Sequence, residues 1–131
     1  MKRLLKPLVI VLVSALPAPA QVIIDITAEA DGRNAVIEWS TGRESGVVDF
    51  SIQRSFDGRT FYTIARVEPL GDNHTYRFVD DDLFKEMLHT YYYRIEVAFS
   101  GGRSQFSPTV DVTLSFSGIH RTWGSIKAMF R

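Results

Sequence analysis

The segment TYYYRIEVAFS, residues 90–100, alternates apolar and polar side chains with a period of two. The residues expected to face a buried core stand at every second position, and they are Tyr93, Ile95, Val97 and Phe99. A period of two is typical of a β-strand with one buried face, because successive side chains point to opposite sides of a sheet. We therefore expect a strand here that contributes to a β-sheet core.

Six other segments carry strand-forming patterns on either side of this one. They are residues 22–30, 35–40, 47–55, 60–67, 75–80 and 104–114. In residues 35–40 the alternation places Ala35, Ile37 and Trp39 on one face, which we expect to be the inner face. Trp39 is the largest of these side chains and is predicted to be central to the core.

The same alternation predicts which side chains of the third and fourth strands face the core. Phe50, Ile52, Phe61, Ile64 and Val67 are expected to face inward, and Ser51 and Gln53 to face outward. The apolar spacing within residues 60–67 slips from two to three. This slip predicts a β-bulge near Thr63.

Turns that contain glycine separate several of these segments. The strongest hairpin signal is Phe56-Asp57-Gly58-Arg59, because Asp-Gly readily supplies the positive φ that a tight turn needs. Asp31-Gly32 and Gly101-Gly102 predict two further turns of this kind.

Two features depart from the plain pattern of strand and turn. Residues 81–89 tolerate a helix, and we expect a single turn that buries Leu83 with Met87 or Leu88. Pro108 lies inside the last predicted strand, which suits a strand at a sheet edge, where a missing backbone N–H is tolerated.

Seven short strands with turns every 8–12 residues or so, and no amphipathic helix long enough for a crossover, predict an all-β fold. The specific expectation is a seven-stranded antiparallel immunoglobulin-like sandwich. A short C-terminal tail follows it, for which a helix is one conformation considered below.

The chain divides into three predicted parts. Residues 1–20 carry a basic head, an apolar run from Leu8 to Leu16 and the small residues Ala18-Pro19-Ala20, which predicts a signal peptide cleaved before Gln21. The apolar run is about ten residues, short of the roughly 20 needed to span a membrane as a helix. Residues 21–115 form the predicted domain, and residues 116–131 a cationic-aromatic tail. We therefore expect an exported protein, periplasmic or extracellular at the cell surface.

Composition excludes several classes of site. The chain has no cysteine, which excludes disulfides, zinc–thiolate sites and thiol nucleophiles. Residues 21–115 hold all 15 acidic residues and nine of the 15 basic ones, a formal net charge of −6. Nucleic acid is not expected as a partner, because phosphate binding needs clustered lysine and arginine.

Three motifs within residues 35–99 together resemble the fibronectin type III domains of bacterial secreted proteins. They are Trp39-Ser40-Thr41, Arg54-Ser55-Phe56-Asp57-Gly58 and Tyr92-Tyr93-Arg94. The resemblance implies that Trp39 is the core tryptophan of the second strand. It also implies that Tyr93 is a corner tyrosine whose hydroxyl bonds back to the preceding loop. What it implies is architecture and not activity, because one fold hosts unrelated functions.

No catalytic or metal-binding pattern emerges from the sequence. The three histidines, His74, His89 and His120, share no zinc-ligand spacing and lack convergent partners for a triad. The run Asp80-Asp81-Asp82 could offer oxygen ligands to calcium, but consecutive side chains cannot all aim at one ion. The resemblance implies instead that an aspartate here closes a turn. We expect no enzyme, no metal and no cofactor.

Tyr62 and Tyr92 are candidates for a sugar-binding face. Both have outward parity if Phe61 and Tyr93 point inward. Flat exposed aromatic rings can stack on sugars or serve as contacts for proteins. Surface tyrosines that only pair across strands are the alternative.

The C-terminal tail holds what the fold does not explain. If Thr122 caps a helix, Trp123, Ile126 and Phe130 form one apolar stripe with Met129 beside it, and Arg121, Lys127 and Arg131 supply positive charge. A helix this short, with Gly124 inside it, is marginal alone in water and needs a surface. That surface is the sandwich itself, a groove on another secreted protein, or a membrane headgroup region.

These observations predict a non-enzymatic exported protein, a protein-binding or accessory module of the cell envelope. The tail residues named above are its expected docking contacts, and the partner is expected to be another envelope or secreted protein. A carbohydrate-binding module that uses Tyr62 and Tyr92, and a structural spacer without a ligand, are the alternatives.

Overall fold

The computed structural model describes residues 20–83 and 88–115, which form eight β-strands with antiparallel pairing throughout. A three-stranded sheet has the order β1-β2-β5, which are Ile23–Asp31, Asn34–Thr41 and Thr75–Asp80. The five-stranded sheet contains β3 (Val47–Ser55), β4 (Tyr62–Val67), β6 (Leu88–Phe99), β7 (Ser104–Phe106) and β8 (Val110–Ser115). Its order is β4-β3-β6, and both β7 and β8 pair with β6.

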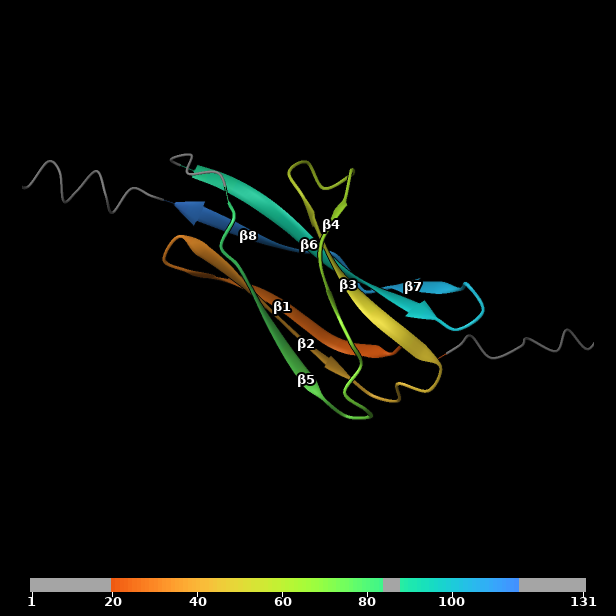
Figure 1. Cartoon of the computed structure of the whole chain (residues 1–131). Helices are drawn as coiled ribbons and strands as arrows, with labels where there is room; N and C mark the ends of the chain where they lie inside the picture. The colour runs from red at the N-terminus through yellow and green to blue at the C-terminus, as the bar shows by residue number, and fades with distance from the viewer. Residues whose placement is uncertain (1–19, 84–87, 116–131) are drawn as a thin grey trace, which may run out of the picture.

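The two sheets lie against each other as the layers of a sandwich (Figure 1). Their facing sides meet in a core whose largest fully buried side chains are Trp39, Tyr91, Tyr93, Phe50, Ile37, Ile52 and Ile95. Trp39 stacks on Tyr76 of β5, with ring centroids 5.2 Å apart and planes inclined by 7°. The predicted all-β antiparallel sandwich is confirmed, with eight strands where seven were expected.

The extra strand arises because the last predicted strand is broken at Pro108. Glu96 of β6 pairs with Phe106 of β7, whereas Tyr93 pairs with Val110 of β8. Between these pairs, Ser107 bonds both backbone groups of Ile95: its N–H donates to the carbonyl at 2.9 Å, and its Oγ accepts from the amide at 2.8 Å. The prediction of one continuous strand over residues 104–114 is therefore wrong. Pro108 has no N–H to continue the ladder, and a serine hydroxyl serves β6 instead.

The predicted bulge near Thr63 is confirmed. Ile52 pairs with Ala65 and Gln53 pairs with Thr63, so Ile64 is the extra residue in β4. The inward orientation predicted for Phe61 is wrong, since its ring lies under the guanidinium of Arg94 on the outer side of the five-stranded sheet. A one-residue insertion reverses the facing of the residues beyond it, because strand side chains alternate.

Ser51 and Gln53 lie on the outer face of β3, as predicted, yet both are buried. Gln53 makes side-chain hydrogen bonds to Arg94 and Glu96 of β6, so it belongs to the polar layer of that face. The alternation correctly predicts the side of the sheet, but it does not reveal that long neighbouring side chains cover that side.

The hairpin signal at residues 56–59 is confirmed as the connection between β3 and β4. One carboxylate oxygen of Asp57, Oδ1, accepts hydrogen bonds from the backbone N–H groups of Thr60 (2.9 Å) and Arg59 (2.8 Å) and from the Ser55 hydroxyl (2.9 Å). Gly58 follows with φ of +79°, and a Cβ there would stand 3.4 Å from the ring of Tyr92. That separation is an ordinary van der Waals contact, so it is the positive φ of the turn that favours glycine here.

We expect the stability that Asp57 contributes to disappear in acid. The donors from Thr60, Arg59 and Ser55 lower the pKa of its carboxyl from 3.8 to about 2. Because the folded pKa is below the unfolded one, the contribution is complete above about pH 4 and is lost as the pH falls towards about 2. The carboxamide of Asp57→Asn does not titrate in this window. The thermal midpoints of variant and wild type should therefore converge on acidification, and a constant difference would contradict the assignment.

Several predictions fall on residues beyond those described. The structure does not describe residues 1–19, which are most of the predicted signal peptide, residues 84–87, which include Met87, or residues 116–131, which are the tail. Leu83 is buried as predicted, while Leu88 begins β6 with its side chain exposed. Within residues 20–83 and 88–115, no helix has the length and apolar character required to cross a membrane.

Candidate functional site

The carboxylate of Asp80 joins the two sheets at the end of β5. Its residue is 3% exposed, and Nη1 of Arg54 in β3 donates to both oxygens at 2.8 and 2.7 Å. The Tyr93 hydroxyl donates to Oδ2 at 2.6 Å. Burial, and then this bond to a carboxylate, raise the pKa of Tyr93 well above its ordinary value. The hydroxyl expected to bond back to a loop is held instead by a side chain at a strand end.

The other two aspartates of the run point to solvent. Asp81 and Asp82 are exposed, and with Asp80 and Arg54 they line a surface hollow of about 240 Å³. The structure thus turns only Asp80 inward, and there Arg54 neutralises it. No group of three or more potential metal ligands gathers anywhere in the described part of the chain.

A second buried carboxylate, Glu44, ties two loops together. Glu44 is 7% exposed, and it accepts hydrogen bonds from the hydroxyls of Thr41 (2.6 Å) and Tyr76 (2.7 Å) and from the Gly71 amide (3.0 Å). Burial raises the pKa of Tyr76 to about 12, against an opposing hydrogen bond from the Leu70 amide. Sequence reasoning missed Glu44, because a polar residue in a polar loop carries no sign of burial.

The described histidines lie in separate places. The ring of His74 contacts the Gly71 and Asp72 carbonyl oxygens within its own loop, at 2.8 and 3.0 Å. His89 lies in β6 of the other sheet, where its ring packs on Tyr91 with centroids 4.6 Å apart. His120 is outside the described residues. The structure therefore does not bring the two described histidines together as a site.

The outer face of the five-stranded sheet carries a cation between two aromatic rings. The guanidinium carbon of Arg94 lies 4.0 Å from the ring centroid of Phe61 and 4.3 Å from that of Phe106. We call these three residues the cation–aromatic stack. Phe61 precedes β4, Arg94 lies in β6 and Phe106 ends β7, so pairing of the strands brings together residues remote in the sequence.

A polar row beside the stack fixes the position of Arg94. Its Nε–H donates to Oε1 of Gln53 at 2.7 Å, and Nε2 of Gln53 donates to Glu96 at 2.9 Å. The Ser104 hydroxyl donates to the other oxygen of Glu96 at 2.9 Å. The sequence marked Arg94 only as part of a motif and gave it no role. Its partners could not be identified before the strand register was known.

The structure places the two candidate tyrosines on different sides of their sheet. Tyr62 pairs with Arg54, whose side chain reaches inward to Asp80, while Tyr92 pairs with Ser55 on the outer side. Tyr62 is 61% exposed, and Tyr92 is half-buried against Gly58. The two rings therefore do not form one flat surface on which a sugar could stack against both.

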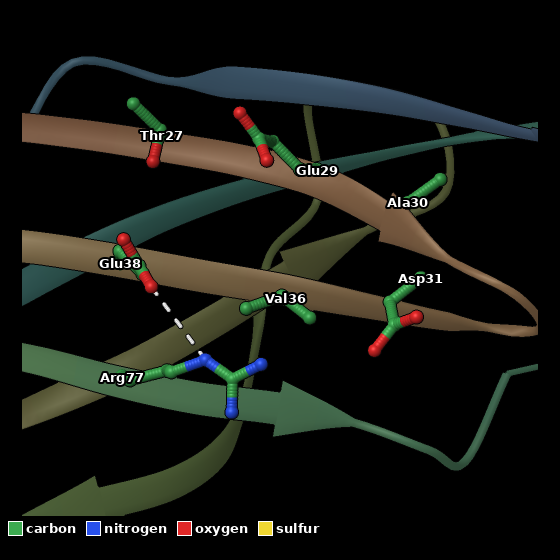
Figure 2. A pocket seen from close by; sticks show the side chains of 7 residues that line it. All are labelled: Thr27, Glu29, Ala30, Asp31, Val36, Glu38 and Arg77. Carbon is green, nitrogen blue, oxygen red and sulfur yellow. Dashed lines mark ion pairs between the residues drawn. The ribbon is translucent and has the colours of Figure 1, made fainter.

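A shallow acidic hollow lies on the outer face of the three-stranded sheet (Figure 2). It measures about 260 Å³ and is lined by Thr27, Glu29, Ala30, Asp31, Val36, Glu38 and Arg77. Arg77 pairs with Glu38 at 3.5 Å, and both side chains are largely exposed. An exposed pair of this kind contributes little to stability.

The predicted docking contacts all lie in the tail, outside the described residues. They are Arg121, Trp123, Ile126, Lys127, Met129, Phe130 and Arg131. The last described strand, β8, ends at Ser115, directly before this segment.

No family model and no curated protein matches the sequence. Nine solved chains match in structure. A pectate lyase from Erwinia chrysanthemi, solved with tetragalacturonic acid, has a TM-score of 0.53 and 21% identity over 66% of this chain and 27% of its own. A pectate lyase from Pectobacterium carotovorum has a TM-score of 0.51 and 18% identity over 67% and 26%. A β-1,2-glucanase from Parabacteroides distasonis has a TM-score of 0.48 and 27% identity over 78% and 13%.

The chain therefore spans about a quarter of the length of the lyases that it resembles. At these identities the likeness shows the fold alone.

Proposed function

We propose that this chain is a non-enzymatic exported protein, and that its fibronectin type III-like sandwich is a protein-binding or accessory module of the cell envelope. The main support is that both buried carboxylates of the described residues accept hydrogen bonds from groups of the sandwich itself. Asp80 is occupied by Arg54 and Tyr93, and Glu44 by hydroxyl and amide donors of its own loops. A catalytic carboxylate must offer an oxygen to a reacting atom, whereas the oxygens of these two already accept hydrogen bonds that hold the framework together.

The strand arrangement supports the resemblance on which this proposal draws. If β7 and β8 count as one strand interrupted at Pro108, seven strands lie in two antiparallel sheets. Trp39 is in the core on the second strand, as the resemblance implies. An architecture of this kind positions surfaces and loops for binding.

The tail is the proposed docking segment. Its aromatic and aliphatic contacts are Trp123, Ile126, Met129 and Phe130, and Arg121, Lys127 and Arg131 orient it electrostatically. Among the described residues, the core of the sandwich is formed by side chains of residues 22–114. The apolar side chains of the tail are proposed to contact a groove on another secreted or envelope protein.

Removal of the last fourteen residues is expected to abolish capture of the partner. Residues 21–131 and residues 21–117 would be used as bait in envelope extract, and the captured proteins compared by mass spectrometry. The matched control is the full tail with Trp123→Ala and Phe130→Ala, which keeps its charge and length. Identical catches from all three baits would remove the role proposed for the tail.

Carbohydrate binding and a spacer role are the alternatives, although Tyr62 and Tyr92 lie on different sides of their sheet and do not offer one surface to a sugar. Sugar binding on a glycan array that survives deletion of residues 118–131 would favour the first. A protein that captures neither sugar nor protein would favour the second.

A further inference from the structure

We infer that the cation–aromatic stack of Phe61, Arg94 and Phe106 is a binding site for a carboxylate group of a partner protein. The inference rests on the proposed protein-binding function and adds a second contact, on the sandwich itself. It follows from three properties of Arg94: its fixed position, its aromatic surroundings and the absence of an acidic partner for it in residues 20–83 and 88–115.

Arg94 is held in place before any ligand arrives. Its Nε–H is bonded to Gln53 at 2.7 Å, and Gln53 is in turn bonded to Glu96 at 2.9 Å and contacts Thr63 at 3.4 Å. An arginine side chain otherwise loses considerable rotamer freedom on binding. Because the network orders the side chain in advance, a ligand meets a smaller entropic cost.

Two phenyl rings lie close to the guanidinium, whose central carbon is 4.0 Å from the ring centroid of Phe61 and 4.3 Å from that of Phe106. Aromatic surface therefore replaces part of the water around the cation. The planar fork of terminal N–H groups suits a carboxylate, which can accept two parallel hydrogen bonds from it. Phe106 is 46% exposed, so the edge of the stack is accessible.

Arg94 has no acidic partner among the residues described. Arg54 pairs with Asp80 and Arg77 with Glu38, whereas no ion pair of this part of the chain includes Arg94. The neighbouring acid on the same face, Glu96, is engaged by Gln53 and Ser104. The terminal nitrogens of Arg94 make no hydrogen bond within the described residues, which leaves them available to an external carboxylate.

The charge of the domain favours a protein over an acidic polysaccharide. Residues 21–115 carry a formal net charge of −6, which repels a polymer with a carboxylate on every unit. A single glutamate or aspartate in a neutral or basic protein segment avoids this repulsion. Arginine and aromatic residues are also the types enriched in protein interfaces.

The test is an NMR titration of residues 21–131 with the peptide acetyl-Ala-Glu-Ala-amide, and with its glutamine counterpart as the matched control. We expect a saturable shift of the Arg94 Nε–H and Phe106 ring signals with the glutamate peptide and none with the glutamine peptide. Arg94→Lys keeps the charge but loses the planar fork, and should weaken binding by about tenfold or more. Phe106→Leu should weaken it less.

Three results would overturn the site: no shift of the Arg94 signal in the folded wild type, equal shifts with both peptides, or a response to trigalacturonate in the absence of any response to the glutamate peptide. The last would assign the stack to uronic acids. A protein that captures an envelope partner but shows no shift would keep the proposed function and lose this site. A shift of the Arg94 signal without any capture of an envelope protein would keep this carboxylate site and count against the proposed function.

Discussion

Replacement of Trp39 with alanine is expected to lower the free energy of unfolding by about 3–5 kcal/mol. The indole is 1% exposed, stacks on Tyr76 at 5.2 Å, and tilts against Phe50 at 6.3 Å. Its removal from the interface between the sheets leaves a cavity that the surrounding strands can only partly fill. Urea unfolding followed by circular dichroism would measure the loss as a lower midpoint.

Trp39→Phe is the matched control, because the indole nitrogen finds no hydrogen-bond partner among the described residues. Phenylalanine therefore sacrifices volume but no polar contact, and the expected cost is below that of alanine, at about 1–2 kcal/mol. A phenylalanine variant as unstable as the alanine variant would show that the nitrogen has a role that the packing does not explain.

Asp80→Asn is expected to cost about 3–5 kcal/mol, because it leaves the charge of Arg54 buried without a partner. The Arg54 side chain is 14% exposed, and its guanidinium donates to both oxygens of Asp80 at 2.7 and 2.8 Å. An amide can accept from Arg54 but cannot neutralise it. Equilibrium unfolding at neutral pH would measure the difference.

Two further variants separate charge from hydrogen bonding at this site. Tyr93→Phe removes one donor and keeps the ion pair, so it should cost less, about 1–2 kcal/mol. Arg54→Leu in the Asp80→Asn background removes the stranded charge, and the double variant should be more stable than Asp80→Asn alone. If the losses in free energy of unfolding caused by Asp80→Asn and by Arg54→Leu simply add in the double variant, the pairing of Arg54 with Asp80 does not stabilise the fold as described.

Much of the framework could be predicted from local patterns. The alternation around Trp39 and Ile95 identified both the strands and their inner faces, because burial of one face imposes a period of two on the sequence. The Asp57-Gly58 turn and the bulge in residues 60–67 were also predicted, since each is specified by a few neighbouring residues.

Two errors, the unbroken strand over residues 104–114 and the inward-facing Phe61, arose because backbone hydrogen bonding and strand register, and not hydropathy, decide where a strand ends and which way its side chains point. Apolar residues continue through residues 104–114, but the missing donor of Pro108 ends the ladder there. The bulge in residues 60–67 was predicted correctly. Its one extra residue reverses the facing of Phe61, however, and places that ring on the outer face of the sheet.

The candidate site depended on the strand register and could not be predicted in advance. Phe61 lies 33 positions before Arg94 and Phe106 lies 12 positions after it, and only the pairing of β4, β3, β6 and β7 brings the three together. Glu44 was also missed, because a polar residue in a polar loop carries no sign of burial and two of its donors, Gly71 and Tyr76, lie far along the chain. The role of the tail stays a prediction.

The direction of β8 determines how the domain would carry mechanical load. The Val22 amide donates to the side chain of Gln105 in β7, whereas Ser115 ends β8 and pairs with Leu88, the first residue of β6 (Figure 1). Tension between these two points runs along the strands. It therefore loads all the hydrogen bonds between β6 and β8 together in shear, and does not break them one after another. A module tethered through its C-terminal end would therefore resist stretching before it yields.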